Sequence, residues 1–109
     1  MATLSITTRT VDDAYVCTVD GAIDSFNADQ LKGQAQTAFL GGSRRLVFDL
    51  TKVAYVASAG LGVFATAMKS FPGKVVFVGL QPYVQQTFRI SGFDKLAALC
   101  PTVADGLRA

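Results

Sequence analysis

The sequence contains no histidine and no tryptophan, and it has only two cysteines. Without histidine, the Ser-His and Cys-His pairs that activate nucleophiles in many hydrolases cannot be assembled within this chain. Two lone cysteines also leave too few soft ligands for the usual zinc sites. These absences exclude most small hydrolase mechanisms, and we expect no enzyme activity, no metal site and no cofactor. Cys17 and Cys100 lie in apolar, strand-like settings, which predicts two free, buried thiols.

Charge is also scarce in this chain. Charged residues make up 17% of its 109 residues, and the formal net charge is +2. A charge this small does not argue for nucleic acid or an anionic membrane as a partner. No apolar run approaches the ~20 residues of a membrane span, and the amino-terminal stretch lacks the apolar core of a signal sequence. The expected compartment is therefore the cytoplasm.

What the sequence does contain is a regular alternation of strand and helix patterns. Half of the residues are apolar, and the length fits a single domain over residues 1–109 with its own core. Alternating runs at 3–8 and 15–19, joined by a short turn, predict an antiparallel hairpin. Further strands are expected at 45–50, 75–78 and 97–100, with helices between them. This order predicts an α/β fold, with a mixed but mainly parallel sheet of four to five strands and about four helices.

Start and stop signals delimit the expected helices. The first follows Asp24, with Ser25 and Asn27 as candidate caps, and Gly41-Gly42 stops it. The second runs from Ser58 to near Phe71, the third from Pro82 to Gly92, and Thr102 with Asp105 predicts a capping box for a last short helix. The apolar stripe of the first helix would consist of Ala28, Leu31, Ala35, Ala38 and Phe39.

Ser58 is the candidate functional residue, because it stands where extended chain becomes helix. At a helix start several backbone N–H groups lack partners and the dipole favours negative charge, so a phosphate would be accommodated there. The small neighbours Ala57, Ala59 and Gly60 leave the hydroxyl accessible, and Gly60 and Gly62 let another backbone approach. The alternative is that Ser58 is simply the helix N-cap, a position that serine favours. The two interpretations are compatible.

Asp24 is a second candidate. Alone, an aspartate after a strand is typical of a turn or a cap. It becomes interesting if the first and third strands bring their carboxyl ends together, and with them Asp24 and Ser58, because ligands gather at such strand ends. The spacing Gly60-x-Gly62-x-x-Ala65 mimics a dinucleotide-binding fingerprint, but the acid that this motif requires further on is missing.

The aromatic residues fall into two groups. Those that follow the periodicity of their elements predict core positions, and they are Phe64, Phe71, Phe77 and Phe88. Those near the ends of elements are candidates for exposed contacts, and they are Phe26, Tyr55, Tyr83 and Phe93.

The stretch Asp49-Leu50-Thr51-Lys52-Val53, followed by Val56-Ala57-Ser58-Ala59-Gly60-Leu61-Gly62, resembles the signature of STAS domains. These are the anti-sigma factor antagonists and their relatives. The resemblance continues in Gly21-Ala22-Ile23-Asp24, in Asn27-Ala28-x-x-Leu31 and in Ile90-Ser91-Gly92-Phe93, so it extends from about Ile6 to Leu107. It implies a small mixed sheet backed by helices, in agreement with the periodicity.

The resemblance also implies a function. In the anti-sigma factor antagonist branch, the matching serine is phosphorylated by a partner kinase that is also the anti-sigma factor. The unmodified antagonist binds that kinase and so releases a sigma factor, and a phosphatase restores binding after phosphorylation. By this resemblance Ser58 would be the phosphoacceptor and Asp24 an acid that assists it. The expected docking surface consists of Phe26, Asn27, Ala57, Ser58, Ala59 and Gly60.

One departure from the family pattern bears on this function. Phosphorylated members commonly carry an aspartate directly before the serine, and this chain carries Ala57. The departure keeps a second interpretation open, in which the chain is a constitutive docking subunit of a larger complex. Such a complex would be a stressosome-type scaffold or a phospholipid-transport complex, and binding would not depend on modification of Ser58.

Overall fold

A computed structural model describes residues 4–109, so Thr3, the first residue of the predicted first strand, lies outside the described residues. Five strands within 4–109 form one sheet in the order β1-β2-β3-β4-β5. The first pair is antiparallel and the other three pairs are parallel, which confirms the mixed, mainly parallel sheet. The strands are β1 (Ser5–Val11), β2 (Ala14–Asp20), β3 (Arg45–Lys52), β4 (Lys74–Val78) and β5 (Ala98–Cys100).

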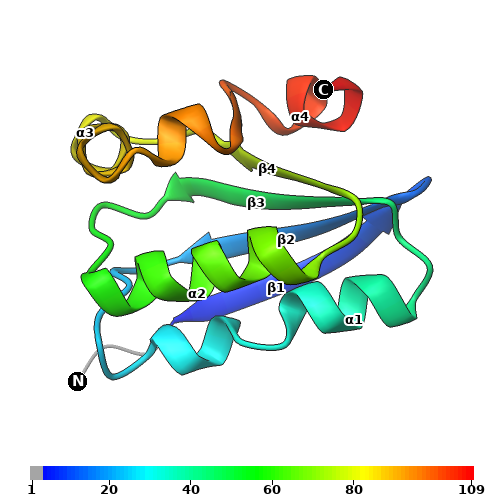
Figure 1. The fold of residues 1–109 in the computed structure, drawn as a ribbon, viewed down its shortest axis with the longest axis horizontal. Helices are drawn as coiled ribbons and strands as arrows, with labels where there is room; N and C mark the ends of the chain where they lie inside the picture. Colours follow the sequence, from blue (N-terminus) through cyan, green and yellow to red (C-terminus); the bar gives the residue numbers. More distant parts are fainter. Residues whose placement is uncertain (1–3) are drawn as a thin grey trace.

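Helices cover both faces of the sheet (Figure 1). One face packs against α1, α2 and α3, and the other against α4. Within residues 4–109 no helix is long and apolar enough to cross a membrane. The helices are η1 (Ala28–Leu31), α1 (Gln34–Leu40), α2 (Ser58–Ser70), α3 (Pro82–Ser91), η2 (Phe93–Lys95) and α4 (Val103–Arg108), of which η1 and η2 are 3-10 turns.

The larger core is built on aromatic rings from alternating elements. Phe64 of α2 lies between Phe48 of β3 and Phe77 of β4, with ring centroids 5.1 and 5.0 Å away. Phe88 of α3 meets Phe77 edge-on at 5.1 Å. The predicted core aromatics Phe64, Phe71, Phe77 and Phe88 are all buried, which confirms that prediction. This packing holds α2 in place along the sheet, and so positions the start of that helix.

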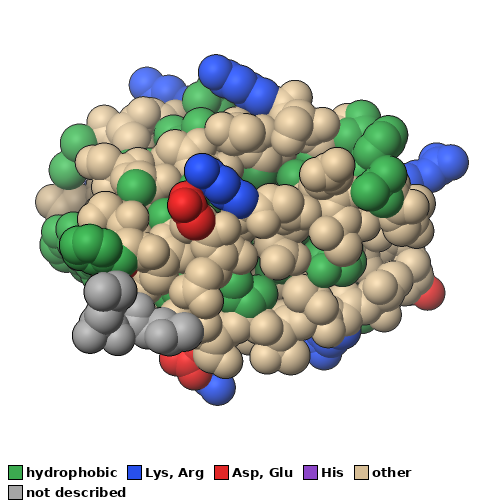
Figure 2. All heavy atoms as spheres, turned by 90° about the horizontal axis from the view of Figure 1, so that it is seen from below, with side chains coloured by type: hydrophobic (Ala, Val, Ile, Leu, Met, Phe, Trp, Pro, Cys, Tyr) green, Lys and Arg blue, Asp and Glu red, His purple; other side chains and the backbone are tan. Residues whose placement is uncertain are grey.

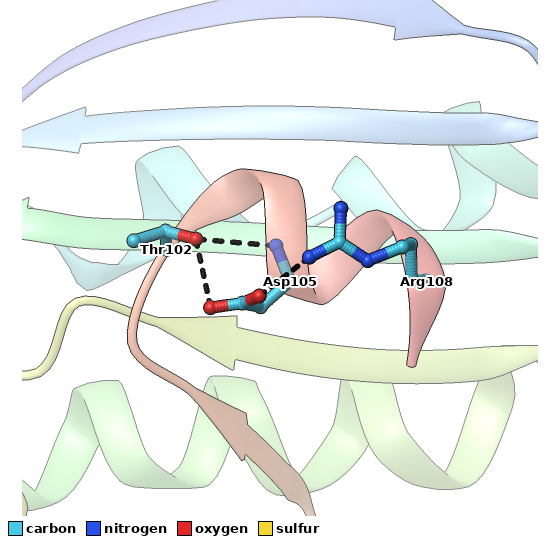
Figure 3. A network of polar contacts seen from close by, with 3 residues as sticks. All are labelled: Thr102, Asp105 and Arg108. Atoms are coloured by element: carbon cyan, nitrogen blue, oxygen red, sulfur yellow. Dashed lines mark hydrogen bonds and ion pairs between the residues drawn. The ribbon is translucent and has the colours of Figure 1, made fainter.

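A smaller core lies under α4 on the opposite face. Its buried residues come from three neighbouring strands: Val16, Val47, Val76 and Val78. The predicted cap of α4 is confirmed, because the Asp105 N–H donates to Thr102 Oγ1 over 3.1 Å. The reciprocal bond runs from the Thr102 hydroxyl to the Asp105 carboxylate, which also pairs with Arg108 at 2.7 Å (Figure 3).

The first predicted helix is wrong in its continuity. The structure divides it into η1 and α1 at Gly33, whose φ of +88° is a left-handed conformation that glycine adopts without strain. The buried stripe of Ala28, Leu31, Ala35 and Ala38 continues across this break, but Phe39 is 54% exposed and does not join it, contrary to the prediction. Cys100 is also only half-buried, whereas Cys17 is buried as predicted.

Candidate functional site

Two loops lie side by side at the carboxyl end of the parallel strands. Strand β2 pairs with β3, and this pairing resumes beyond both strands as a parallel bridge between Ile23 and Val56. The Ile23 N–H donates to the Tyr55 carbonyl over 2.9 Å, and the Ala57 N–H donates to the Ile23 carbonyl over 2.8 Å. Asp24 is therefore brought beside the start of α2.

The prediction that strand ends unite Asp24 and Ser58 named the wrong strand. The second strand, β2, lies beside the third, while the first strand pairs only with β2 on its far side. The reason is that β1 and β2 form a hairpin, so the sheet grows from the inner strand of that hairpin. The expected juxtaposition still results, because Asp24 follows β2 in the chain.

Ser58 is exposed and is the first residue of α2. The N-cap position belongs to Ala57, whose φ of −79° and ψ of 168° are extended, and no side chain caps this helix. Among the described residues the Ser58 hydroxyl makes no hydrogen bond. The alternative interpretation of Ser58 as the N-cap is therefore wrong. The hydroxyl oxygen of Ser58 is accessible to another molecule.

The small residues beside Ser58 have different positions. Ala59 is exposed and Ala57 is half-buried, but Gly60 is buried against the bridge between the two loops. A Cβ atom at Gly60 would lie 2.6 Å from Ile23 Cγ2 and 2.9 Å from Val56 Cγ1. Gly60 thus lets α2 begin directly against the bridge, and because it is buried it is not available for the predicted docking surface.

Asp24 caps the turn that leads into η1. Its Oδ1 accepts the N–H groups of Phe26 over 2.8 Å and Asn27 over 2.9 Å, while its own N–H donates to Asn27 Oδ1 over 2.8 Å. This reciprocal arrangement is a capping box. Of the two candidate caps, Asn27 does occupy the N-cap position of η1, although no hydrogen bond from its side chain caps that helix. Ser25 is not the cap, and the side chain that caps the preceding turn is that of Asp24. The spacing Asp-x-x-Asn was the sequence signal for it.

The capping box separates two predicted docking residues. Asn27 is 3% exposed, and its Nδ2 also donates to the Ala22 carbonyl over 2.9 Å. Its side chain is therefore part of the loop's interior and cannot form a docking surface, contrary to the prediction. Phe26 is 74% exposed, and the capping bond to its N–H holds its backbone in place. The loop presents one aromatic ring next to the start of α2.

Two exposed tyrosines lie in the segments that follow β3 and β4. Tyr55 is 42% exposed and Tyr83, in the first turn of α3, is 57% exposed. Their ring centroids lie 6.0 Å apart. The sequence marks each as a candidate contact but carries no signal that they meet. Phe93, from the same group, instead packs against Phe88 at 5.6 Å and belongs to the edge of the core.

The chemistry available at this site is that of an acceptor. An exposed serine hydroxyl can receive a phosphoryl group, but the chain has no histidine to act as a base, and Asp24 Oδ1 is occupied by two N–H donors. Residues 4–109 contain no group of three or more metal-binding side chains. The accessible reactive group in this arrangement is therefore the Ser58 hydroxyl.

Comparison with known proteins gives consistent matches. The STAS domain model matches residues 5–106. The chain is 33% identical over 93 residues to BtrV of Bordetella bronchiseptica, provisionally named an anti-sigma factor antagonist, covering 83% of this chain and 80% of that protein. The structure of this chain is similar to that of an anti-sigma factor antagonist from Mycobacterium paratuberculosis, with a TM-score of 0.85 and 26% sequence identity. The alignment covers 96% of this chain and 92% of that protein.

The fold also matches that of SpoIIAA from Bacillus. The structure of its phosphorylated form aligns with a TM-score of 0.73 and 17% identity, over 95% of this chain and 97% of SpoIIAA. A structure of the unphosphorylated form aligns with the same TM-score. At this identity the likeness is one of fold.

Proposed function

Since the chain belongs to the STAS domain family, we propose that it is an anti-sigma factor antagonist whose binding is gated by phosphorylation of Ser58. In its unmodified form it binds a kinase-type anti-sigma factor and so releases a sigma factor in the cytoplasm. Phosphorylation of Ser58 by that kinase ends the binding, and a protein phosphatase restores it. The chain is a binding module and not an enzyme.

The observation that carries this proposal is the state of the Ser58 hydroxyl. It is exposed, it makes no hydrogen bond among the described residues, and it stands at the first position of a helix that no side chain caps. SpoIIAA, which shares the fold, has been solved in a phosphorylated form. A kinase can therefore reach Ser58 without unfolding any part of the site.

Charge explains why phosphate would act as a gate. A phosphate adds about −1.5 to −2 charges and three strong acceptors. The start of α2 tolerates that charge because its first N–H groups are open and its dipole is favourable. A partner surface that packed on Phe26 and Ala59 would have to remove water from the phosphate. The free energy lost by this desolvation would be much larger than the free energy gained from the contact. We expect the fold to survive phosphorylation while docking fails.

The test is to incubate the protein with its cognate kinase and ATP and to map phosphate by mass spectrometry. We expect one phosphate on Ser58 and none on Ser58→Ala. Thr66 is a matched control on the same helix, since it is exposed but its hydroxyl donates to the Gly62 carbonyl over 3.0 Å. Thr66→Ala should leave phosphorylation unchanged. The proposal would be refuted if no phosphate were found on Ser58 and if Ser58→Glu bound the kinase as tightly as the unmodified protein does.

Two variants separate the possible roles of Asp24. Asp24→Asn keeps an oxygen that can accept from Phe26 and Asn27 but removes the charge, whereas Asp24→Ala removes both. If the carboxylate assists phosphorylation, as we propose, Asp24→Asn slows phosphate transfer while the unfolding midpoint changes little. A normal transfer rate in Asp24→Asn, with a loss of binding only in Asp24→Ala, would restrict Asp24 to its capping role.

A second function is favoured by Ala57. If the missing aspartate prevents phosphorylation, the same surface serves constitutive docking in a larger complex, such as a stressosome-type scaffold or a phospholipid-transport complex. A pull-down would then recover scaffold or transporter components and no kinase, and the recovery would not change in Ser58→Glu.

A further inference from the structure

The segments that contain Ser58 and Tyr83 are poor in charge, although Lys52 is exposed at the end of β3, directly before the first of them. The segment 53–68, which runs through the β3–α2 loop and most of α2, contains no charged residue. The segment 79–88, which forms the β4–α3 loop and most of α3, also contains none. In the loop before η1 the one charged residue is Asp24, and its carboxylate is engaged in the capping box. Depletion of charge distinguishes the centre of a protein–protein interface from ordinary surface.

Exposed aromatic rings gather at this same end. Phe26 projects from the loop before η1, and the Tyr55–Tyr83 pair projects from the β3–α2 loop and the start of α3. Figure 2 shows hydrophobic side chains at the left end of the molecule, the end at which α2 begins in Figure 1, and a second group at the right end. Tyrosine is enriched among the residues that dominate interface energies, because its ring is large and few rotamers are lost on binding.

The tyrosine pair is continuous with the Ser58 site through the backbone. The Tyr55 carbonyl accepts the Ile23 N–H of the bridge that joins the two loops, so Tyr55 is fixed relative to Ala57 and Ser58. Tyr83 follows Pro82, which occupies the first turn of α3 and fixes its backbone. The pair is therefore preorganised, and a partner would lose little entropy by ordering it.

We propose that the Tyr55–Tyr83 pair is a second docking element for the kinase-type anti-sigma factor that binds at Ser58. We propose also that this partner presents an apolar, uncharged surface to the pair. The inference rests on the proposed function and extends it, because it states the chemistry of the partner's surface. In a contact formed mainly by uncharged side chains, a phosphate on Ser58 would add charge that the partner's apolar surface could not pair.

Binding measurements on Tyr83→Ala test this inference. Tyr83 is more than half exposed, so its truncation should leave the thermal midpoint unchanged. We expect the dissociation constant for the unphosphorylated protein and its cognate kinase-type anti-sigma factor to rise by at least about tenfold. Tyr83→Phe, which keeps the ring, should retain most of the affinity. Phe39→Ala is the matched control, because it removes an exposed ring of similar accessibility at the far end of α1, and we expect no change.

Salt supplies an independent readout. An uncharged interface predicts that affinity for the unphosphorylated protein changes little between low and high salt. Equal affinities of Tyr83→Ala and Phe39→Ala, or a steep loss of affinity with salt, would overturn the inference. If either result occurs while Ser58→Glu still abolishes binding, the proposed function stands without it. If Tyr83→Ala weakens binding but Ser58→Glu does not, the docking surface stands and phosphorylation gating fails.

Discussion

At the scale of single residues, Gly60 and Gly62 show that two glycines in one helix can have different structural roles. Both lie near the start of α2 and both belong to the family signature. A Cβ at Gly60 would collide with Ile23 and Val56, whereas a Cβ at Gly62 would meet nothing within 4 Å. Sequence alone gives them the same interpretation, as small residues that permit close approach. Only Gly60 has that role within the fold.

These positions give a paired prediction for stability. Gly60→Ala should destabilise the protein by about 1–3 kcal/mol, because α2 would have to move away from the bridge. Gly62→Ala should stabilise it by about 0.5–1 kcal/mol, since alanine restricts the unfolded chain and fits the open space. Urea unfolding of the two variants measures both changes. Equal effects of the two substitutions would contradict the packing described for Gly60.

The Cys17 thiol predicts a pH dependence. Burial raises its pKa from 9.0 to about 12. The folded protein thus holds this proton more tightly than the unfolded chain, so the contribution to stability is full below pH 9.0 and is lost as pH rises toward about 12. Cys17→Ala should be less stable at neutral pH, because of the cavity, but should lose less stability on going to alkaline pH. Urea titrations of both proteins at neutral and alkaline pH would show this difference in slope, and parallel slopes would count against it.

At the scale of elements, α2 begins without a cap although its length and packing are those of a well-anchored helix. The N-cap residue is Ala57, the position at which phosphorylated family members commonly carry aspartate. An aspartate there would accept from the open N–H groups of the first turn and would complement the helix dipole. The absence of this side chain leaves those N–H groups free for a phosphate on Ser58.

We therefore expect Ala57→Asp to stabilise the protein by about 0.5–2 kcal/mol. Ala54→Asp is a suitable control, because it adds the same charge at an exposed loop position three residues before the N-cap. Thermal or urea unfolding compares the two. A gain in stability shared by both variants would point to net charge and not to capping.

At the scale of the whole molecule, one arginine links the carboxyl-terminal helix to the sheet. The Arg45 guanidinium, at the start of β3, donates to the carbonyl oxygens of Leu107 and Ala109 at the end of α4. The helix has six residues and lies over a small valine cluster, and a helix this short is not stable by itself. Arg45 therefore holds the element that covers this face.

Removing this contact should loosen α4 in particular. Arg45→Ala is expected to lower the local opening free energy of Val103–Arg108 by about 1–3 kcal/mol, while β3 and β4 stay protected. Hydrogen exchange followed by mass spectrometry reports on each segment. Arg44→Ala is the control, since this neighbouring side chain is exposed. Exchange in α4 that is equally fast in both variants would show that the valine cluster, and not Arg45, holds the helix.

Several elements of this protein follow from local sequence signals. The hairpin, the buried strands β3 and β4, the starts of α2 and α3, and the cap at Thr102 all depend on periodicity or on a residue's backbone preference, which act over a few residues. The same kind of signal placed Ser58 at the start of a helix. Local signals failed at Gly33, where a glycine inside a continuous apolar stripe ended one helical turn and began another.

The relations between distant segments were decided by tertiary structure. Strand pairing beyond β2 and β3 placed Asp24 beside the start of α2. Packing of α3 on the core brought Tyr83 to Tyr55. The physical reason is that a residue's own sequence determines its backbone preference and its tendency to be buried, whereas its neighbours across the sheet depend on which apolar faces close over one another. The sequence by itself thus determined most of the elements and the position of Ser58 at a helix start, and the packed sheet decided the surface that surrounds Ser58.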